Sequence, residues 1–402
     1  MTATAVLASG RLLGRTRAAW LAGIGVVLIA LNLRLGISSA SALLEALRTD
    51  LGFGSAAAAA LPALPTLSFA AAGFFTGRIA GRLGTERTVL LALAALTAGL
   101  ALRGIHTTWA LLTGTVLGMS GLALCNVLLP TLLRAHFPAR VTLLTSVYTT
   151  VMALGSTLGA AVAVPLAARV GSPSLGLAAW AVPALLATLV WAFVRPPAAQ
   201  SAAPSDARRG TYVSPWAMAR TRLGALVTAY FALQALNCYA IIGWLPTMLS
   251  EQGMSSGGAG GILAVTQAVG IPATFLVLAV ARAPHRLRRA FTAISAAMLA
   301  GLVGLLLAPL ALPVAWALLI GFGLCSFPLV LAVIGNSGTS PGETTALSSL
   351  SQSLGYLVAA AGPFAIGLLR SASGGWTVPM AALLVTAAAQ LAVGMALTAQ
   401  RH

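Results

Sequence analysis

Charged residues are scarce in this chain: Asp, Glu, Lys and Arg together make up 7% of its 402 residues. Only six are acidic, and the 23 basic residues are all arginine, which leaves a formal net charge of +17. A basic excess of this size is common in nucleic-acid-binding proteins. Here, however, the arginines are spread thinly between apolar runs, with no basic stripe and no stacking aromatics. We therefore expect no nucleic-acid partner.

Cysteine is also rare, with only Cys125, Cys238 and Cys325, each inside an apolar segment. An odd number of such cysteines argues against a disulfide framework, and no metal-ligand spacing connects them to a histidine. The sequence shows no nucleophile paired with a base and no cluster of metal ligands, so we expect neither an enzyme nor a bound metal or cofactor. Nothing resembles the filter loop or the ring of charges of a channel.

Long apolar runs are abundant: 59% of the residues are hydrophobic, and the mean hydropathy is +0.96. A run of about 20 apolar residues is long enough to cross a bilayer as a helix. We predict twelve membrane-spanning helices, at 19–44, 55–77, 87–104, 107–133, 141–168, 174–194, 223–248, 258–281, 290–308, 312–335, 346–369 and 377–398. The first run is too long for the apolar core of a signal peptide and has no small-residue cleavage site, so we expect it to be retained.

The arginines predict how these helices are oriented. If both termini are cytoplasmic, 18 arginines fall in inner segments and only Arg48, Arg103, Arg169 and Arg370 in outer ones, while Arg34 lies within a helix. Cytoplasmic loops of membrane proteins carry the excess of positive charge. We predict a multi-pass protein of a bacterial cytoplasmic membrane, embedded in the lipid bilayer with both termini in the cytoplasm.

One long polar segment divides the chain. Residues 195–222 are rich in Pro, Ala, Ser and Arg, which predicts a flexible linker. It separates an N-terminal six-helix bundle, 1–194, from a C-terminal six-helix bundle, 223–402.

The two bundles also share short sequence matches. Residues 121–126 (GLALCN) recur as 321–326 (GFGLCS), and 180–183 (WAVP) recur as 376–379 (WTVP). Two matches at nearly the same offset, between segments of similar orientation, indicate a parallel repeat about an axis along the membrane normal. The expected fold is all-α and integral to the membrane, with twelve transmembrane helices in two pseudo-symmetric bundles.

Arg34 is the most informative single residue, because it lies about two residues past the midpoint of the first run. An ionised side chain at that depth costs about 2.5–3.5 kcal/mol on insertion scales, so it normally faces a watery cavity and a polar or charged partner. By the predicted topology all the acidic residues lie in loops or at helix ends: Glu45, Asp50, Glu86, Asp206, Glu251 and Glu343. We therefore expect an anionic or strongly dipolar substrate as the partner of Arg34. Coupling through a protein carboxylate is not expected, which leaves uniport, exchange or a proton that travels with the substrate.

The loop after the second run resembles the signature loop of major-facilitator transporters in its spacing of glycines and arginines. Glycine lets the chain turn tightly, and the arginines can hold helix ends and carboxylates on the inner face. Gly81 stands where the signature has an acidic residue, which departs from the usual charge pairing at the inner gate. A positive-inside loop is the alternative, which explains the arginines but not the glycine spacing. The residues assigned to the loop are Gly77, Arg78, Gly81, Arg82, Gly84 and Arg87.

Several short segments, in order along both halves, resemble the cyanate/2-nitroimidazole permease family. They are Asn32-Leu33-Arg34, Gly99 to Arg103, Asn126 to Pro130, His136 to Arg140, Trp244-Leu245-Pro246, Gln352 to Tyr356, and Gly362-Pro363. The resemblance implies a major-facilitator fold and transport of small anions or small polar heterocycles. It leaves the particular substrate open.

Helical periodicity gathers polar side chains on single faces of several predicted helices. Arg34 and Ser38 share a face of the first helix, whereas Asn32 lies on another. The predicted substrate-binding residues are Arg34, Asn32, Ser38, Asn126, Thr149, Tyr230, Gln234, Asn237, Gln267, Gln352 and Tyr356. For each amide or tyrosine the competing interpretation is a hydrogen bond that only joins helices, worth about 0.6 kcal/mol on average. For Arg34 a binding role is favoured, because joining helices needs no full charge and the planar fork suits a carboxylate-like or linear anion.

The favoured prediction is a monomeric secondary carrier for a small polar or anionic molecule. It would bind its substrate near the midplane and expose it alternately by rocking one half against the other. The alternative is a drug or metabolite efflux carrier of the same fold, with a larger and more aromatic pocket. An aromatic content of 6%, with Arg34 central, favours the smaller ligand.

Overall fold

The computed structural model describes residues 3–194, 215–281, 284–335 and 341–399, and it contains helices and no strand over these ranges. The helices follow in this order: α1 (Ala3–Ala42), α2 (Leu44–Leu51), α3 (Ser55–Leu83), α4 (Thr85–Leu102), α5 (Thr108–His136), the 3-10 helix η1 (Pro138–Arg140), α6 (Val141–Val170), α7 (Pro173–Ala178), α8 (Ala181–Ala192), α9 (Pro215–Ala219), α10 (Arg222–Glu251), α11 (Ser256–Ala268), α12 (Gly270–Ala281), α13 (Pro284–Leu307), α14 (Pro313–Leu324), α15 (Ser326–Gly335), α16 (Pro341–Ser373) and α17 (Thr377–Ala399).

Apolar length explains why most of these segments are helical. No water is present in a bilayer core to satisfy backbone groups, so a spanning segment makes its hydrogen bonds within itself. Over the described ranges, nine segments are long and apolar enough to span a membrane. They are Trp20–Ala42, Thr85–Leu102, Thr108–Leu133, Leu143–Val170, Pro173–Ala192, Arg222–Glu251, Arg286–Leu307, Ala346–Ser373 and Thr377–Ala399. Each coincides with one of the twelve predicted runs.

The other three predicted runs are also helical but are mixed in composition or interrupted. The run 55–77 falls in α3. The run 258–281 is divided between α11 and α12 at Val269, and the run 312–335 is divided between α14 and α15 at Cys325. Helices therefore lie at all twelve expected positions, while the number of membrane crossings stays a prediction.

The predicted linker, 195–222, lies outside the described residues as far as 214. Its described end is not a plain coil, because it contains the short helix α9 and the start of α10. The Thr221 hydroxyl accepts a hydrogen bond from the backbone N–H of Gly224 at 3.0 Å and so caps α10.

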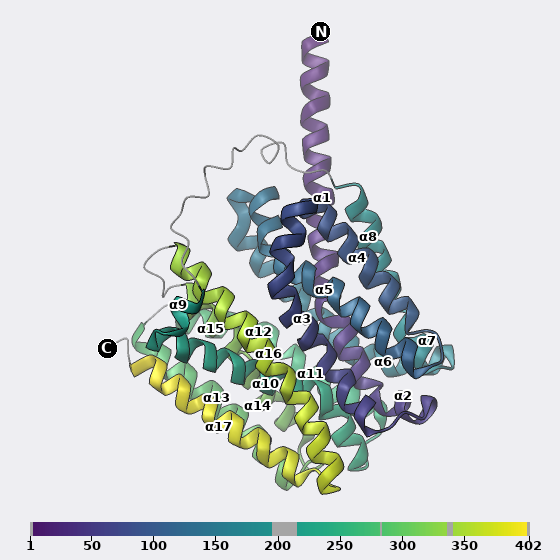
Figure 1. Ribbon diagram of the computed structural model, residues 1–402, viewed down its shortest axis with the longest axis vertical. Helices are drawn as coiled ribbons and strands as arrows, with labels where there is room; N and C mark the ends of the chain where they lie inside the picture. The colour runs from purple at the N-terminus through teal and green to yellow at the C-terminus, as the bar shows by residue number, and fades with distance from the viewer. Residues whose placement is uncertain (1–2, 195–214, 282–283, 336–340, 400–402) are drawn as a thin grey trace.

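Two groups of helices lie side by side, as Figure 1 shows, with α1–α8 on one side and α10–α17 on the other. In the first group α1 packs against α6, and α4 packs against α5. In the second group α10 packs against α16, and α13 packs against α14 and α17. The groups meet where α3 contacts α16 and where α6 contacts α11.

A glycine seam between α1 and α6 sets the rotation of α1. A Cβ at Gly155 would lie 2.2 Å from the Leu31 carbonyl oxygen, and one at Gly159 would lie 2.5 Å from that of Leu35. Only residues without a side chain permit backbones to approach this closely in a membrane bundle. With Leu31 and Leu35 held against α6, Arg34 is turned toward α10.

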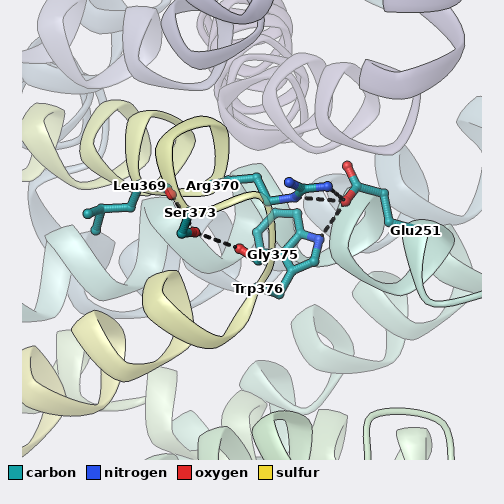
Figure 2. A network of polar contacts seen from close by, with 6 residues as sticks. All are labelled: Glu251, Leu369, Arg370, Ser373, Gly375 and Trp376. Atoms are coloured by element: carbon teal, nitrogen blue, oxygen red, sulfur yellow. Dashed lines mark hydrogen bonds and ion pairs between the residues drawn. The ribbon is translucent and has the colours of Figure 1, made fainter.

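A polar cluster around Glu251 connects helix ends at one end of the second group (Figure 2). Arg370 donates to Glu251 Oε2 from Nε at 2.9 Å and from Nη2 at 2.5 Å, and Trp376 Nε1 donates to the same oxygen at 2.8 Å. Ser373 donates to the Leu369 carbonyl at 2.6 Å. These contacts join the end of α10 to the end of α16 and the turn before α17. A partly exposed ion pair is worth about 1 kcal/mol or less, so the cluster mainly aligns helix ends.

Candidate functional site

Arg34 lies where helices of both groups come together. Its guanidinium carbon is 5.0 Å from the centroid of the Tyr239 ring, on α10. The Arg34 Nη1 atom is buried and has no hydrogen-bond partner among the described residues, and the same is true of the Tyr239 hydroxyl. A cation over an aromatic face is attracted by the ring quadrupole, by about 2 kcal/mol when desolvated. That attraction does not supply an acceptor for Nη1.

Aromatic rings extend the site from Tyr239. Phe69, on α3, is stacked on Tyr356, on α16, with ring centroids 5.5 Å apart. Tyr239 lies 6.3 Å from Tyr356 and 6.4 Å from Phe69, so the three rings form one cluster. Phe231 packs edge-on against Tyr356 at 5.4 Å. The cluster beside Arg34 is thus built by α3, α10 and α16, from both groups of helices.

Sequence reasoning found Arg34 and Tyr356 in this cluster but missed Tyr239 and Phe69. On a helix of 3.6 residues per turn, Tyr239 lies about 140° round from Gln234 and so projects from a different face of α10. The signal that points to Tyr239 is its own position: a tyrosine at mid-depth needs a partner for its hydroxyl.

Tyr230, Gln234 and Asn237 instead point into the second group of helices. All three are fully buried, and they surround Gln390 of α17. Gln390 Nε2 donates to Gln234 Oε1 at 2.7 Å and to the Tyr230 hydroxyl at 3.3 Å, and Gln390 Oε1 accepts from Asn237 Nδ2 at 3.0 Å. Ser326 also donates to Gln234 Oε1. The structure therefore does not bring these three residues to Arg34.

Ser38 and Gln267 are joined through a residue that sequence reasoning did not single out. Ser38, on α1, and Ser156, on α6, are 2.7 Å apart between hydroxyl oxygens. Gln267 Nε2, on α11, donates to Ser156 Oγ at 2.5 Å. This chain of polar contacts crosses between the two groups of helices, one turn along α1 from Arg34.

The remaining predicted binding residues are dispersed. Asn32 donates from Nδ2 to the Leu28 carbonyl at 2.8 Å, and its Oδ1 is buried without a partner among the described residues. Thr149 donates to the Thr145 carbonyl at 2.9 Å, and Gln352 donates to Ser348 Oγ at 2.8 Å, both within their own helices. Asn126 is half-buried on α5.

The signature-like loop is a tight turn between α3 and α4. Gly84 adopts φ +83°, a left-handed conformation that favours glycine, and it separates Leu83 from Thr85. Gly77 lies within α3, and Gly81 is exposed with open space around its Cα. Over the described part of the chain, no ion pair with a carboxylate is formed by the three exposed arginines of the loop, Arg78, Arg82 and Arg87.

Glu86 and His136 form a pair that sequence reasoning did not predict. His136 Nε2 lies 3.5 Å from Glu86 Oε1, and both side chains are about nine-tenths buried. Trp191 covers the pair, with its Nε1 donating to the Glu86 carbonyl at 3.2 Å. Burial lowers the pKa of His136, and the neighbouring carboxylate of Glu86 offsets part of that shift.

Arg103 was counted among the arginines of the outer segments. It follows the last residue of α4, and its side chain is 1% exposed. Its guanidinium points back to α1, where Nη1 donates to the Gly36 carbonyl at 3.3 Å. A long arginine side chain at the end of α4 can fold into the bundle, which a count of charges per loop does not detect.

A bundle of apolar helices with a buried cation between its two groups defines a multi-pass membrane transporter. The chain belongs to the Major Facilitator Superfamily, whose family model matches residues 26–363.

Curated relatives cover most of the chain. It is 35% identical over 380 residues to the 2-nitroimidazole transporter of Escherichia coli (strain K12), covering 92% of this chain and 93% of the relative. It is 34% identical over 377 residues to the uncharacterized transporter YycB of Bacillus subtilis (strain 168), covering 92% of each. Identity to the cyanate transport protein CynX of E. coli (strain K12) is 28% over 354 residues, or 87% of this chain and 90% of the relative.

Solved structures share the fold at low sequence identity. A bacterial homologue of the human lysosomal transporter Spinster, in an inward-facing and unoccupied conformation, matches with a TM-score of 0.79 at 14% identity, covering 95% of this chain and 97% of the other. The D-xylose–proton symporter matches with a TM-score of 0.68 at 16% identity, covering 92% and 96%. The major-facilitator fold predicted from the sequence is thus confirmed.

Proposed function

We propose that this protein carries a small anion or a small, strongly polar organic solute across a bacterial cytoplasmic membrane, with Arg34 at the binding site. The observation that carries the proposal is the guanidinium of Arg34, whose Nη1 is buried without a hydrogen-bond partner among the described residues and which lies over the Tyr239 ring. A buried charge without a partner is costly, so the bound solute is the natural source of the missing acceptor.

The chemistry of the cluster suits a small planar or linear ligand. The guanidinium offers two parallel N–H donors to an acceptor, and the Tyr239 hydroxyl offers one more. The rings of Phe69 and Tyr356 provide flat apolar walls. Relatives named for 2-nitroimidazole and cyanate, which are small and planar or linear, support this class of cargo.

In this proposal, bundles 1–194 and 223–402 rock against each other, so that the site opens to the two sides of the membrane in turn. The protein acts as a monomer. Close contacts between the bundles occur where a Cβ at Gly367 would lie 2.6 Å from Ala59 Cβ, and where one at Gly243 would lie 2.7 Å from Pro62 Cβ. Ala59 and Pro62 lie toward the start of α3, on the outer side if both termini are cytoplasmic. We therefore assign this conformation as closed to the outside.

A transport assay tests the proposal. Purified protein in proteoliposomes would be given labelled cyanate, with 2-nitroimidazole and small carboxylates as competitors. We expect saturable uptake by the parent and by Arg48→Gln, which removes an exposed arginine, and at least tenfold lower uptake by folded Arg34→Gln. Equal uptake by Arg34→Gln and the parent would remove Arg34 from the site.

Efflux of larger metabolites or drugs is the second candidate, and the aromatic cluster is the observation that favours it. Phe231, Phe69, Tyr239 and Tyr356 make the site richer in rings than the 6% aromatic content of the chain suggests. If the folded parent moves none of the small compounds but expels a bulky aromatic dye from loaded vesicles, the efflux function replaces the small-solute one.

A further inference from the structure

A second arginine is buried in the N-terminal group of helices, away from the aromatic cluster. Arg103 follows the last residue of α4 and is 1% exposed. Its one hydrogen bond runs from Nη1 to the Gly36 carbonyl at 3.3 Å, which is long for such a contact. Its Nε is buried and has no partner among the described residues.

No protein charge compensates Arg103. Over the described residues it takes part in no ion pair with a carboxylate. Burial lowers its pKa to about 10, so the guanidinium remains protonated at neutral pH. Neutral main-chain acceptors alone rarely balance a fully buried cation.

A pocket adjoins this guanidinium. It has an empty volume of at most about 280 Å³, and it lies between α1, α3 and α5. Apart from Arg103 its lining is made of small, apolar and hydroxyl-bearing side chains: Gly36, Ile37, Ala40, Ser41, Leu44, Leu61, Pro62, Pro65 and Thr115. The hydroxyls of Ser41 and Thr115 donate to carbonyls of their own helices. The pocket thus holds one unpaired positive charge and no acidic residue.

The position of the pocket relates it to the proposed binding site. Gly36 and Arg34 are two residues apart on α1, or about 3 Å along the helix axis. Pro62, which lines the pocket, also faces Gly243 of α10 at the contact between the bundles. The guanidinium groups of Arg34 and Arg103 therefore both lie beside the same turn of α1. Neither is paired with a carboxylate among the described residues.

We propose that Arg103 and this pocket form a second subsite for a small monovalent anion, separate from Arg34. The ligand is an anion with a compact acceptor, which is either the transported anion on its way to Arg34 or an inorganic halide. The subsite extends the proposed function, since it supplies a second positively charged binding position beside Arg34. It stands on its own contacts, however, and binding to it does not require Arg34.

Thermal unfolding of the purified, full-length protein tests the subsite. Sodium chloride and sodium cyanate would each be titrated against sodium gluconate at constant ionic strength, so that screening is matched. Six proteins would be compared: the parent, Arg34→Gln, Arg103→Gln, the double variant, Arg103→Lys, and Arg48→Gln as a control that removes an exposed charge.

The Arg34→Gln protein carries the decisive result. We expect it to retain a saturable rise in Tm of about 2 °C at anion concentrations well above Kd, and we expect the double variant to lose that rise. The anion that acts at the lower concentration identifies the source. Arg103→Lys, which keeps a charge, should retain a weaker response, whereas a purely structural Arg103 would leave the Arg34→Gln protein with no anion response.

The absence of a saturable response in Arg34→Gln would overturn the subsite, as would an equal response in the double variant. This outcome is distinct from failure of the proposed function, which would appear as unchanged cyanate transport in Arg34→Gln. If Arg103→Gln does not fold, the Arg34→Gln and Arg103→Lys titrations still decide the question.

Discussion

At the level of single residues, burial leaves polar atoms of the candidate site unpaired. The Arg34 Nη1 atom and the Tyr239 hydroxyl both lie in the aromatic cluster without hydrogen-bond partners among the described residues. The ring of Tyr239 already contributes through its contact with the guanidinium at 5.0 Å. Ring and hydroxyl can therefore be separated by substitution.

Tyr239→Phe should keep the cation–π contact and lose only the hydroxyl. A hydrogen bond to a charged ligand contributes about 1.5–3 kcal/mol, so we expect KM for the transported anion to rise about tenfold or more, with the protein folded normally. Initial rates of uptake in proteoliposomes measure this. Tyr230→Phe, which removes a hydroxyl on another face of α10, serves as the control. An unchanged KM in Tyr239→Phe would exclude the hydroxyl from the site.

His136 predicts how stability depends on pH. Burial lowers its folded-state pKa below the ordinary value of 6.5, so the unfolded chain takes up the proton first as pH falls. Its contribution to stability is complete above pH 6.5 and is lost as the pH falls below that value. We expect Tm of the parent to drop more steeply between pH 7 and pH 5 than Tm of His136→Gln, and equal slopes would contradict the burial of this histidine.

At the scale of helices, α1 and α10 show that a sequence predicts the position of a helix better than the direction in which each of its faces points. The apolar runs predicted the positions of the helices well, because lipid demands a long apolar segment and backbone bonding within the segment. Arg34 was found because a charge at mid-depth is rare. Which way a helix faces was harder to foresee, because rotation is fixed by partners that are distant in sequence.

The polar face of α10 is the example. Tyr230, Gln234 and Asn237 share a face, as predicted, but the partner of that face is Gln390, more than 150 residues later, as the contacts of Asn237 and Gln234 show. Periodicity does not distinguish a face that meets a substrate from one that meets another helix. Tyr239, on a different face, is the residue that reaches Arg34.

Gln390→Leu tests this structural role of α17. The substitution removes the hydrogen bonds from Gln390 to Gln234 and Asn237 and leaves the buried Asn237 Nδ2 without its acceptor, so we expect destabilisation of about 1–3 kcal/mol. KM of the surviving folded protein should stay within about twofold of the parent value. Thermal unfolding and uptake kinetics, with the half-buried Gln352→Leu for comparison, would be measured. A large rise in KM without destabilisation would instead show that this network is part of the substrate site.

At the scale of the whole molecule, the transport cycle requires contacts between the bundles to break and re-form. The polar chain from Ser38 through Ser156 to Gln267 spans α1, α6 and α11. It holds the bundles together one turn from Arg34. Removal of one small hydroxyl from this chain of contacts should therefore change the balance between conformations.

Ser156→Ala should favour the conformation that is open to the outside. Loss of two hydrogen bonds shifts the balance by about 1–2 kcal/mol. Spin labels at the exposed positions Thr49 and Ala372, with the native cysteines replaced, report the separation of the two bundles. We expect a larger population at long distance in Ser156→Ala than in the half-buried control Ser120→Ala. Identical distributions would show that this chain of contacts does not keep the outer side closed.

The central claim is that the charge of Arg34 binds the transported anion. Equilibrium binding of labelled cyanate to purified parent, Arg34→Lys and Arg34→Gln, at fixed ionic strength, tests it most directly. We expect intermediate affinity for the lysine variant, which keeps a charge without the planar fork, and at least about tenfold weaker binding for the glutamine variant. Equal affinity in all three folded proteins would contradict it.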